Sequence, residues 1–309
     1  MPTKFLAELG GKLAERWFTT LFIPAFIFWI GGLGTWMWRF GWIGSSIEGW
    51  FIQQSEFLQF TIVIGALLLI GLSAFTIQRF DLLILRLLEG YWPSFTKPVR
   101  IWLIKRQQRW LKRSEKRWQV LALKRENDDL NTQELNELIS LDLKLRQHPS
   151  QHEYLMPTKL GNLLRAAERR PLEKYGLDAV ICWPRLWLLL PEDIKKELQE
   201  ARADLNTAAR TWLWSILFLV WTVWVWWAIL ISISFVWFAY RWILSSATTY
   251  ADLLEAVFDL YRLLLYQAMN WPLPQDPSEE LQLGKLLTEY LWRGSDQPSP
   301  KFVHRVAKR

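Results

Sequence analysis

The sequence holds little of the chemistry that binds metals or carries redox reactions, with one cysteine and three histidines in 309 residues. A single thiol, Cys182, cannot form a disulfide within the chain or build a cysteine-rich metal site, and this usage is typical of a protein that faces the cytosol. His148 and His152 have the spacing of a metal site on a helix, but Pro149 between them opposes a helix there. We therefore expect no metal ligands and no cofactor.

Motifs of the common enzyme classes are also missing. The glycines Gly31, Gly32 and Gly34 come closest to a nucleotide-binding loop, but they lie inside an apolar run, where glycine favours close packing of helices. No serine, histidine and aspartate are grouped in a pattern typical of a nucleophile and its base. We therefore predict no catalytic residue and expect that the chain is not an enzyme.

Charge is absent from three long apolar runs, at about residues 17–38, 57–77 and 211–240. Each of the first two runs is long enough to cross about 30 Å of hydrocarbon at about 1.5 Å per residue. Ion-coupled transporters and proton relays normally place ionisable groups inside the membrane. The uncharged runs therefore disfavour those two classes of protein.

Tryptophan is what the sequence has in excess, with 22 residues that gather around the apolar runs. An indole combines an apolar body with one N–H donor, so it prefers the boundary between hydrocarbon and lipid headgroups. The tryptophans of the first and last runs are Trp17, Trp29, Trp36, Trp38 and Trp42, and then Trp212, Trp214, Trp221, Trp224, Trp226, Trp227, Trp237 and Trp242. This distribution predicts an integral membrane protein.

Lysine and arginine are missing from residues 40–56, which connect the first two runs, whereas basic residues precede the first run and Arg79 follows the second. Positively charged flanks are retained on the cytoplasmic side of a membrane. We therefore predict that the N-terminus and the residues after Arg79 are cytoplasmic. Residues 1–16 are predicted to form an amphipathic helix beside the membrane.

Glycine and proline are both absent between Glu192 and Trp271, although about eighty residues of unbroken helix would be about 120 Å long. The thirty uncharged residues 211–240 are long for one untilted span and short for two. A single span would place the central tryptophans at the middle of the bilayer. We therefore predict a short tryptophan-rich hairpin over 211–246, and we expect the hydroxyl residues 245–249 to end one helix and cap the next.

A strongly basic helix is predicted over residues 97–125, which contain eleven lysines and arginines and one acidic residue. Its tryptophans lie eight residues apart, and we expect them near one face of the helix. The candidate contacts to lipid headgroups are Trp102, Lys105, Arg106, Arg109, Trp110, Lys112, Arg113 and Trp118. With a net charge of +7 and a pI near 9.5 for the whole chain, the pattern favours anionic lipid. A nucleic-acid surface and an acidic protein partner are the alternatives.

Local signals predict further helices in the middle of the chain. Asn131 and Glu134 have the spacing of a capping box at the start of a helix. Another helix is expected between the two prolines of residues 157–171. Residues 175–184 are short and bounded by turn residues, so we expect a loop or a single strand there, and Pro191 is expected to begin the next helix.

A narrow acidic stripe follows the hairpin. Asp252, Glu255 and Asp259, followed by Arg262, recur at three- and four-residue steps and share one face of a predicted helix. Repeated by symmetry in an oligomer, these acids would form a carboxylate ring that attracts cations at a cytoplasmic mouth. The alternative is that they pair with the cations of residues 97–125 or with Arg262.

Three segments resemble those of an uncharacterised group of bacterial multi-pass membrane proteins: LGGKLAERW at 9–17, PTKLGNLLRAAE at 157–168 and YLWRG at 290–294. The resemblance covers most of the chain in outline. It implies a bacterial inner-membrane protein and brings no assigned activity with it.

The sequence thus predicts an all-α membrane protein with about four membrane segments, two full spans and the short hairpin, and a helical cytoplasmic region. Its parts are expected to be an amphipathic helix at 1–16, two spans at 17–79, a cytoplasmic region at 80–210, the hairpin at 211–246, and cytoplasmic helices with a tail at 247–309. The hydroxyls available to line a pore are those of Thr61, Ser73, Thr76, Thr222, Ser232 and Ser234. We expect a homo-oligomeric channel with a cytoplasmic gating region, or alternatively a non-conducting anchored scaffold that recruits a cytoplasmic protein partner.

Overall fold

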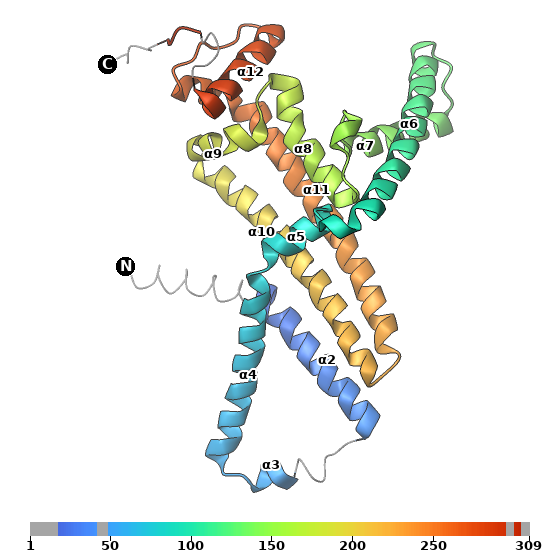
Figure 1. Cartoon of the computed structure of the whole chain (residues 1–309), viewed down its shortest axis with the longest axis vertical. Coiled ribbons are helices and arrows are strands. Elements are labelled where there is room, and N and C mark those ends of the chain that lie inside the picture. The colour runs from blue at the N-terminus through green and yellow to red at the C-terminus, as the bar shows by residue number, and fades with distance from the viewer. Residues whose placement is uncertain (1–17, 42–48, 295–299, 304–309) are drawn as a thin grey trace. The chain divides into compact units, whose positions relative to one another are not determined.

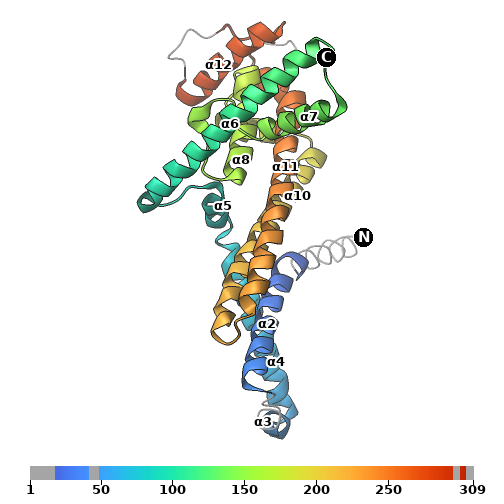
Figure 2. The same ribbon diagram turned by 90° about the vertical axis from the view of Figure 1, so that its right-hand side faces the viewer.

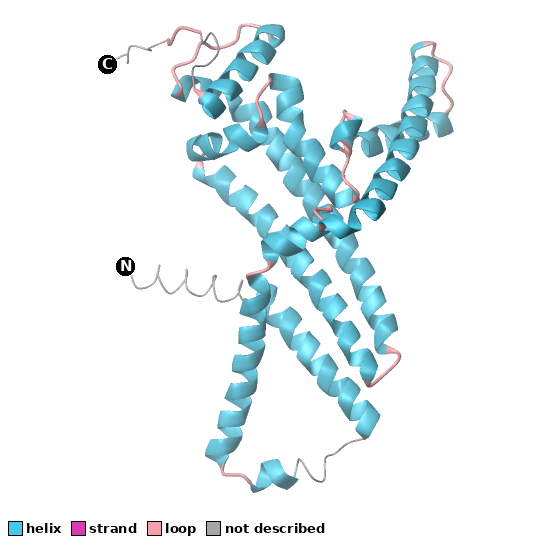
Figure 3. Ribbon diagram, in the orientation of Figure 1, coloured by secondary structure: helices cyan, strands magenta, loops and turns pink. Residues whose placement is uncertain are grey.

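The computed structural model describes the chain except for residues 1–17, 42–48, 295–299 and 304–309. The predicted amphipathic helix at 1–16 and most of the C-terminal tail lie outside the described residues. Every regular element in the described part is a helix, as Figure 3 shows, and none is a strand. The prediction of an all-helical fold is confirmed.

The chain divides into two compact units, each made of two segments. The first unit contains Met1–Leu85 and Ala203–Ile243, and the second contains Arg86–Arg202 and Leu244–Arg309. Two long helices, α10 (Glu192–Leu217) and α11 (Ala228–Ala268), carry residues of both units.

The first unit holds the apolar helices. Its described elements before the hairpin are η1 (Phe18–Phe22), α2 (Ile23–Phe40), α3 (Gly49–Gln53), α4 (Glu56–Gln78) and the start of α5 (Asp81–Glu89). Within the described residues, three helical stretches are long and apolar enough to cross a membrane: Phe18–Phe40, Glu56–Gln78 and α11. The first two agree with the spans predicted from the sequence, and α2 packs on α4, where the indole N–H of Trp29 donates to the Ser73 hydroxyl at 3.2 Å.

The tryptophan-rich run reverses direction, as predicted. After α10 the chain tightens into the 3-10 helix η5 (Phe218–Val223), turns, and enters α11 at Ala228. In Figures 1 and 2 the two arms lie side by side, and the Ser232 hydroxyl donates across them to the Ser215 carbonyl at 2.5 Å. Trp221 and Trp224 stack at the turn with ring centroids 4.9 Å apart.

The predicted break at residues 245–249 is wrong, because α11 runs through it without interruption. The hydroxyl of Thr248 donates to the Leu244 carbonyl, and that of Thr249 to the Ser245 carbonyl. These hydroxyls bond one turn back within their own helix, so they do not cap a new one.

The second unit is a cluster of helices. Its elements beyond α10 and α11 are the end of α5, η3 (Ser94–Thr96), α6 (Lys97–Glu126), α7 (Thr132–Arg146), η4 (His152–Tyr154), α8 (Lys159–Tyr175), α9 (Ala179–Leu189) and α12 (Pro277–Arg293). The capping box is confirmed: the Asn131 side chain accepts from the Glu134 N–H at 2.8 Å, and Glu134 accepts in return from the Asn131 N–H.

Two local predictions in this unit are wrong. Helix α8 continues past Pro171 to Tyr175 and ends at Gly176, whose φ of +72° gives the left-handed conformation that terminates helices. The stretch expected to be a loop or strand is helix α9. The Asp178 carboxylate caps it by accepting from the N–H groups of Val180 and Ile181, at 2.9 and 3.2 Å.

Candidate functional site: an acidic stripe and a basic helix face

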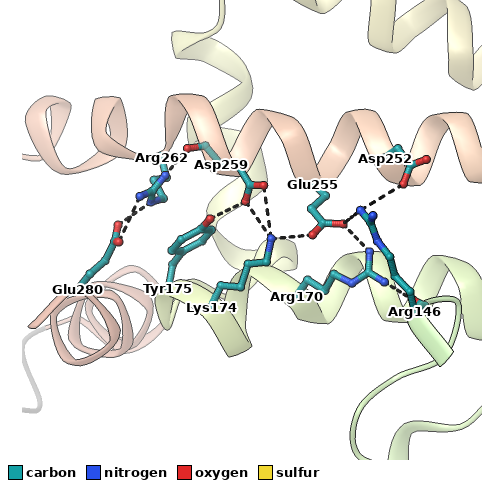
Figure 4. A network of polar contacts seen from close by, with 9 residues as sticks. All are labelled: Arg146, Arg170, Lys174, Tyr175, Asp252, Glu255, Asp259, Arg262 and Glu280. Atoms are coloured by element: carbon teal, nitrogen blue, oxygen red, sulfur yellow. Dashed lines mark hydrogen bonds and ion pairs between the residues drawn. The ribbon is translucent and has the colours of Figure 1, made fainter. Parts of the chain in front are cut away.

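The acidic stripe lies on α11 in the second unit and faces other helices of that unit (Figure 4). Glu255, at its centre, is only 6% exposed. A buried carboxylate is costly unless cations or hydrogen-bond donors surround it, so its surroundings decide what the stripe can do.

Three cations from α7 and α8 surround Glu255. The Lys174 Nζ lies 2.7 Å from Oε1, the Arg146 guanidinium lies 3.0 Å from Oε2, and Arg170 also bonds Oε2. Both oxygens are therefore occupied from inside the unit. Arg170 in addition donates to the Arg146 carbonyl, which ties the end of α7 to α8.

The network continues along α11 on both sides of Glu255. Asp259 accepts from the Tyr175 hydroxyl at 2.6 Å and lies 3.4 Å from the Lys174 Nζ. Arg262 bonds Glu280 of α12 at 2.6 Å and lies over the ring of Tyr175. These contacts connect α8, α11 and α12.

At the other end of the network, Asp252 lies 3.7 Å from Arg146, with its side chain 58% exposed. The network contains four cations, Arg146, Arg170, Lys174 and Arg262, and four carboxylates, Asp252, Glu255, Asp259 and Glu280. The formal charge of the network is therefore zero.

Tyr175 acts as a hydrogen-bond donor and not as a titrating group. Burial raises its pKa, and the hydrogen bond to Asp259 raises it further, to about 12. Its hydroxyl therefore stays protonated at neutral pH and keeps its bond to Asp259. The arrangement as a whole holds helices α7, α8, α11 and α12 together.

The pairing predicted for the acids is wrong in its partners. None of the cations of residues 97–125 bonds the stripe among the described residues, and the Arg262 guanidinium pairs with Glu280. Sequence reasoning missed Arg146, Arg170, Lys174, Tyr175 and Glu280. One signal could have found two of them: Arg170 and Lys174 are four residues apart on a helix, as Glu255 and Asp259 are, with opposite charge.

Comparison with known proteins does not constrain the function of this chain. Models of protein families, curated proteins and solved structures give no match to this chain. The resemblance of three segments to bacterial multi-pass membrane proteins therefore stays a prediction, and the assignment of function rests on the geometry of this chain.

The basic helix α6 forms as predicted, but its tryptophans do not share one face. Eight residues turn an α-helix by about 80° beyond two full turns, so Trp102, Trp110 and Trp118 rotate progressively around it. Trp102 is 55% exposed, Trp110 lies against His148 with ring centroids 5.3 Å apart, and Trp118 is half-buried. Trp102 lies centrally among the cations, whereas Trp110, 40% exposed, lies at their edge.

The remaining candidates are brought together on the side of α6 opposite its buried residues. We call this surface the outward face of α6, and its members are Ile101, Trp102, Lys105, Arg106, Arg109, Lys112, Arg113 and Lys116. All eight are exposed. Nearer the C-terminal end of the helix, Arg117 pairs with Glu137 at 2.7 Å and Lys124 with Glu134 at 2.6 Å, which ties α6 to α7.

The two histidines with metal-like spacing do not lie on one helix. His148 follows α7 and bonds the Lys144 carbonyl through Nδ1 at 2.9 Å, whereas His152 begins η4 and lies 3.7 Å from Glu115. Burial lowers the pKa of His148. Within the described residues, no three side chains of histidine, cysteine, aspartate or glutamate cluster as metal ligands.

The hydroxyls proposed to line a pore bond to backbone carbonyls. Thr61, Ser73, Thr76, Thr222 and Ser234 bond within their own helices, and Ser232 bonds the Ser215 carbonyl. A cavity of about 240 Å³ between α2, α10 and α11 is lined mainly by apolar side chains. Its three hydroxyls, those of Thr211, Ser215 and Ser232, also donate to carbonyls. Such a surface offers little to stabilise a water-filled path.

Proposed function

We propose that this chain is a membrane-anchored scaffold that does not conduct ions. Its apolar helices would hold it in a bacterial inner membrane, with both termini in the cytoplasm, and its second unit would recruit a cytoplasmic protein. The closed charge network around Glu255 carries the proposal, because it favours the scaffold over the channel.

A cation-selective mouth needs carboxylates with free oxygens and an excess of negative charge. Glu255 has neither, since three cations occupy its oxygens and the network sums to zero. Asp259 is held by Lys174 and Tyr175. The stripe is better explained as a set of ion pairs and hydrogen bonds that hold α11 to its neighbouring helices.

A docking surface for a partner is available on α7. Leu135, Ile139 and Leu143 recur every four residues, so they share one face, and their exposed fractions run from 39% to 58%. Ion pairs with α6 fix the other side of the helix. An exposed apolar stripe between polar neighbours is typical of a surface that packs against a helix of another protein.

The homo-oligomeric channel is the second candidate, and one observation in the first unit favours it. Gly65 and Gly71 on α4 have nothing within 4 Å of where a Cβ would lie. The two glycines are six residues apart and so lie about 120° from each other around the helix, but a small residue at an open position of a membrane helix permits the close approach of another helix. This observation favours self-association and says nothing about conduction.

Photo-crosslinking in cells tests the scaffold. A photoreactive residue at Ile139 is expected to give an adduct between this chain and another protein, because Ile139 is the centre of the α7 stripe. Leu135→Gln together with Leu143→Gln should abolish the adduct, since apolar contact area is lost on both sides of the probe. This chain is purified together with its cross-linked adducts, and the mass of each adduct identifies the second protein.

The matched control places the same photoreactive residue at Val180 on α9, which is also an exposed apolar position of the second unit. It should give no adduct with that protein. An adduct between two copies of this chain at Ile139 would instead support the homo-oligomer. The absence of any adduct at Ile139 would contradict recruitment through α7.

A further inference from the structure

We propose that the outward face of α6 binds the surface of an anionic lipid bilayer, with Trp102 and Ile101 entering the headgroup region. This inference does not depend on whether the chain is a scaffold or a channel. It narrows the eleven cations of α6 to the six that the structure brings together on one surface: Lys105, Arg106, Arg109, Lys112, Arg113 and Lys116.

Charge complementarity is the first argument. The chain contains no acidic residue between Glu89 and Glu115, and Glu115 lies at the edge of the face, near His152. Among the residues that the structure describes, none of the six cations has a carboxylate within ion-pair distance. A cluster of unneutralised cations of this size is what an anionic membrane surface attracts.

The second argument is the apolar content of the same surface. Trp102 is 55% exposed, Ile101 lies next to it, and Phe95, just before α6, is 82% exposed. Trp102 also carries Arg106 over its ring, 5.8 Å from the centroid. Aromatic and aliphatic side chains among lysines and arginines are typical of helices that lie in a membrane interface.

The geometry disfavours single-stranded nucleic acid as the ligand. Such ligands need several aromatic rings on one surface, so that successive bases can stack along a basic groove. In α6 the rotation of about 80° between tryptophans removes Trp110 and Trp118 from the outward face. Trp110, 40% exposed, packs at a tilt against His148, so only Trp102 lies centrally among the cations.

The full-length chain in lipid nanodiscs provides the test. An environment-sensitive fluorophore is attached to the new thiol of an Ile101→Cys variant in a Cys182→Ser background, and quencher-bearing lipid is included in the disc. We expect quenching in discs that contain phosphatidylglycerol and little in discs of phosphatidylcholine alone. High salt should reverse the quenching, because it screens exposed charges.

The decisive variant is Lys105→Gln, Arg109→Gln and Lys112→Gln together, which removes three cations from the face. The equilibrium for docking is expected to weaken on the order of a hundredfold for three cations. The matched control, Arg185→Gln, Lys196→Gln and Arg293→Gln, removes the same charge from exposed positions elsewhere in the second unit and should leave quenching unchanged. Far-UV circular dichroism checks that both variants keep their helices.

Three results would overturn the proposal. The first is equal quenching in anionic and neutral discs. The second is an equal loss of quenching in the α6 variant and in its control. The third is a fluorophore that responds to added single-stranded RNA but not to anionic lipid. A Trp102→Ser variant gives an independent check, since insertion of the indole predicts a smaller blue shift of the neighbouring fluorophore even with all six cations present.

Discussion

Replacement of Glu255 by glutamine is expected to open the second unit and to expose Cys182 roughly 30 to 150 times more often. Glutamine cannot neutralise Arg146, Arg170 and Lys174, so these cations lose their common partner. Arg146 and Lys174 are partly exposed and can regain water, whereas Arg170 is largely buried. We therefore expect the second unit to lose about 2–3 kcal/mol of stability against opening, which is below the full cost of breaking a deeply buried ion pair.

The native thiol measures this loss directly. Cys182 is the only cysteine of the chain and is fully buried, and burial raises its pKa to about 11. Reaction with a thiol reagent therefore requires the second unit to open, and its rate follows the opening equilibrium. A tenfold increase in rate corresponds to about 1.4 kcal/mol.

The control is Asp252→Asn, which removes a carboxylate from the exposed end of the same network. Surface ion pairs contribute at most about 1 kcal/mol, so labelling should rise no more than about fivefold. Equal labelling rates for Glu255→Gln and the wild-type chain would show that the network does not stabilise the packing of α11 in the second unit.

Substitution of Gly284 by alanine is expected to have an effect of similar or greater size. A Cβ at this position of α12 would lie 1.8 Å from the Tyr175 carbonyl oxygen, which is backbone and cannot move alone. Helices α8 and α12 must separate, and Thr288, one turn further along α12, lies 3.9 Å from the Cys182 sulfur. We expect a loss of about 3 kcal/mol and at least a hundredfold faster labelling of Cys182.

Gly71→Ala is the matched control, because the same methyl group on α4 would meet no atom within 4 Å. Alanine also favours a helix over glycine by up to about 1 kcal/mol, so this variant should be neutral or slightly more stable. Labelling of Gly284→Ala at the wild-type rate would mean that α8 and α12 do not pack as closely as the structure has them.

Elements defined by local sequence were predicted well. Helix α4 follows from an uncharged apolar run, and α7 from the capping box of Asn131 and Glu134. The reversal after α10 was predicted from the central tryptophans, which a single span would place at the middle of the bilayer, although no glycine or proline marks the turn. In each case the deciding signal lies within one short stretch of the chain.

Predictions failed where one local signal competed with another. Pro171 was taken as the end of a helix, yet Gly176 ends it, because only the glycine supplies the left-handed residue that closes the last turn. Asp178 was overlooked as the cap of α9. The hydroxyl residues near Thr248 bond back into α11 and leave it unbroken.

Spacing along the chain could have suggested Arg170 and Lys174, but it could not give the whole ion network. Glu255 and Lys174 are 81 residues apart, and their contact depends on the packing of α8 against α11. The periodic acids correctly indicated a polar face but not its partners. The composition of the outward face of α6 could be predicted from the sequence. Which residues belong to this face follows from the helical rotation between residues, which places Trp102 centrally among the cations, Trp110 toward their edge and Trp118 away from them.

The most direct test of a non-conducting scaffold is cation flux through liposomes that contain the purified full-length chain. Asp252, Glu255 and Asp259 are neutralised within the second unit, so we predict flux equal to that of protein-free liposomes. The same result is expected when all three acids are changed to asparagine or glutamine. A cation-selective flux in the wild-type chain that falls on this triple change would contradict the scaffold and restore the carboxylate ring of a pore.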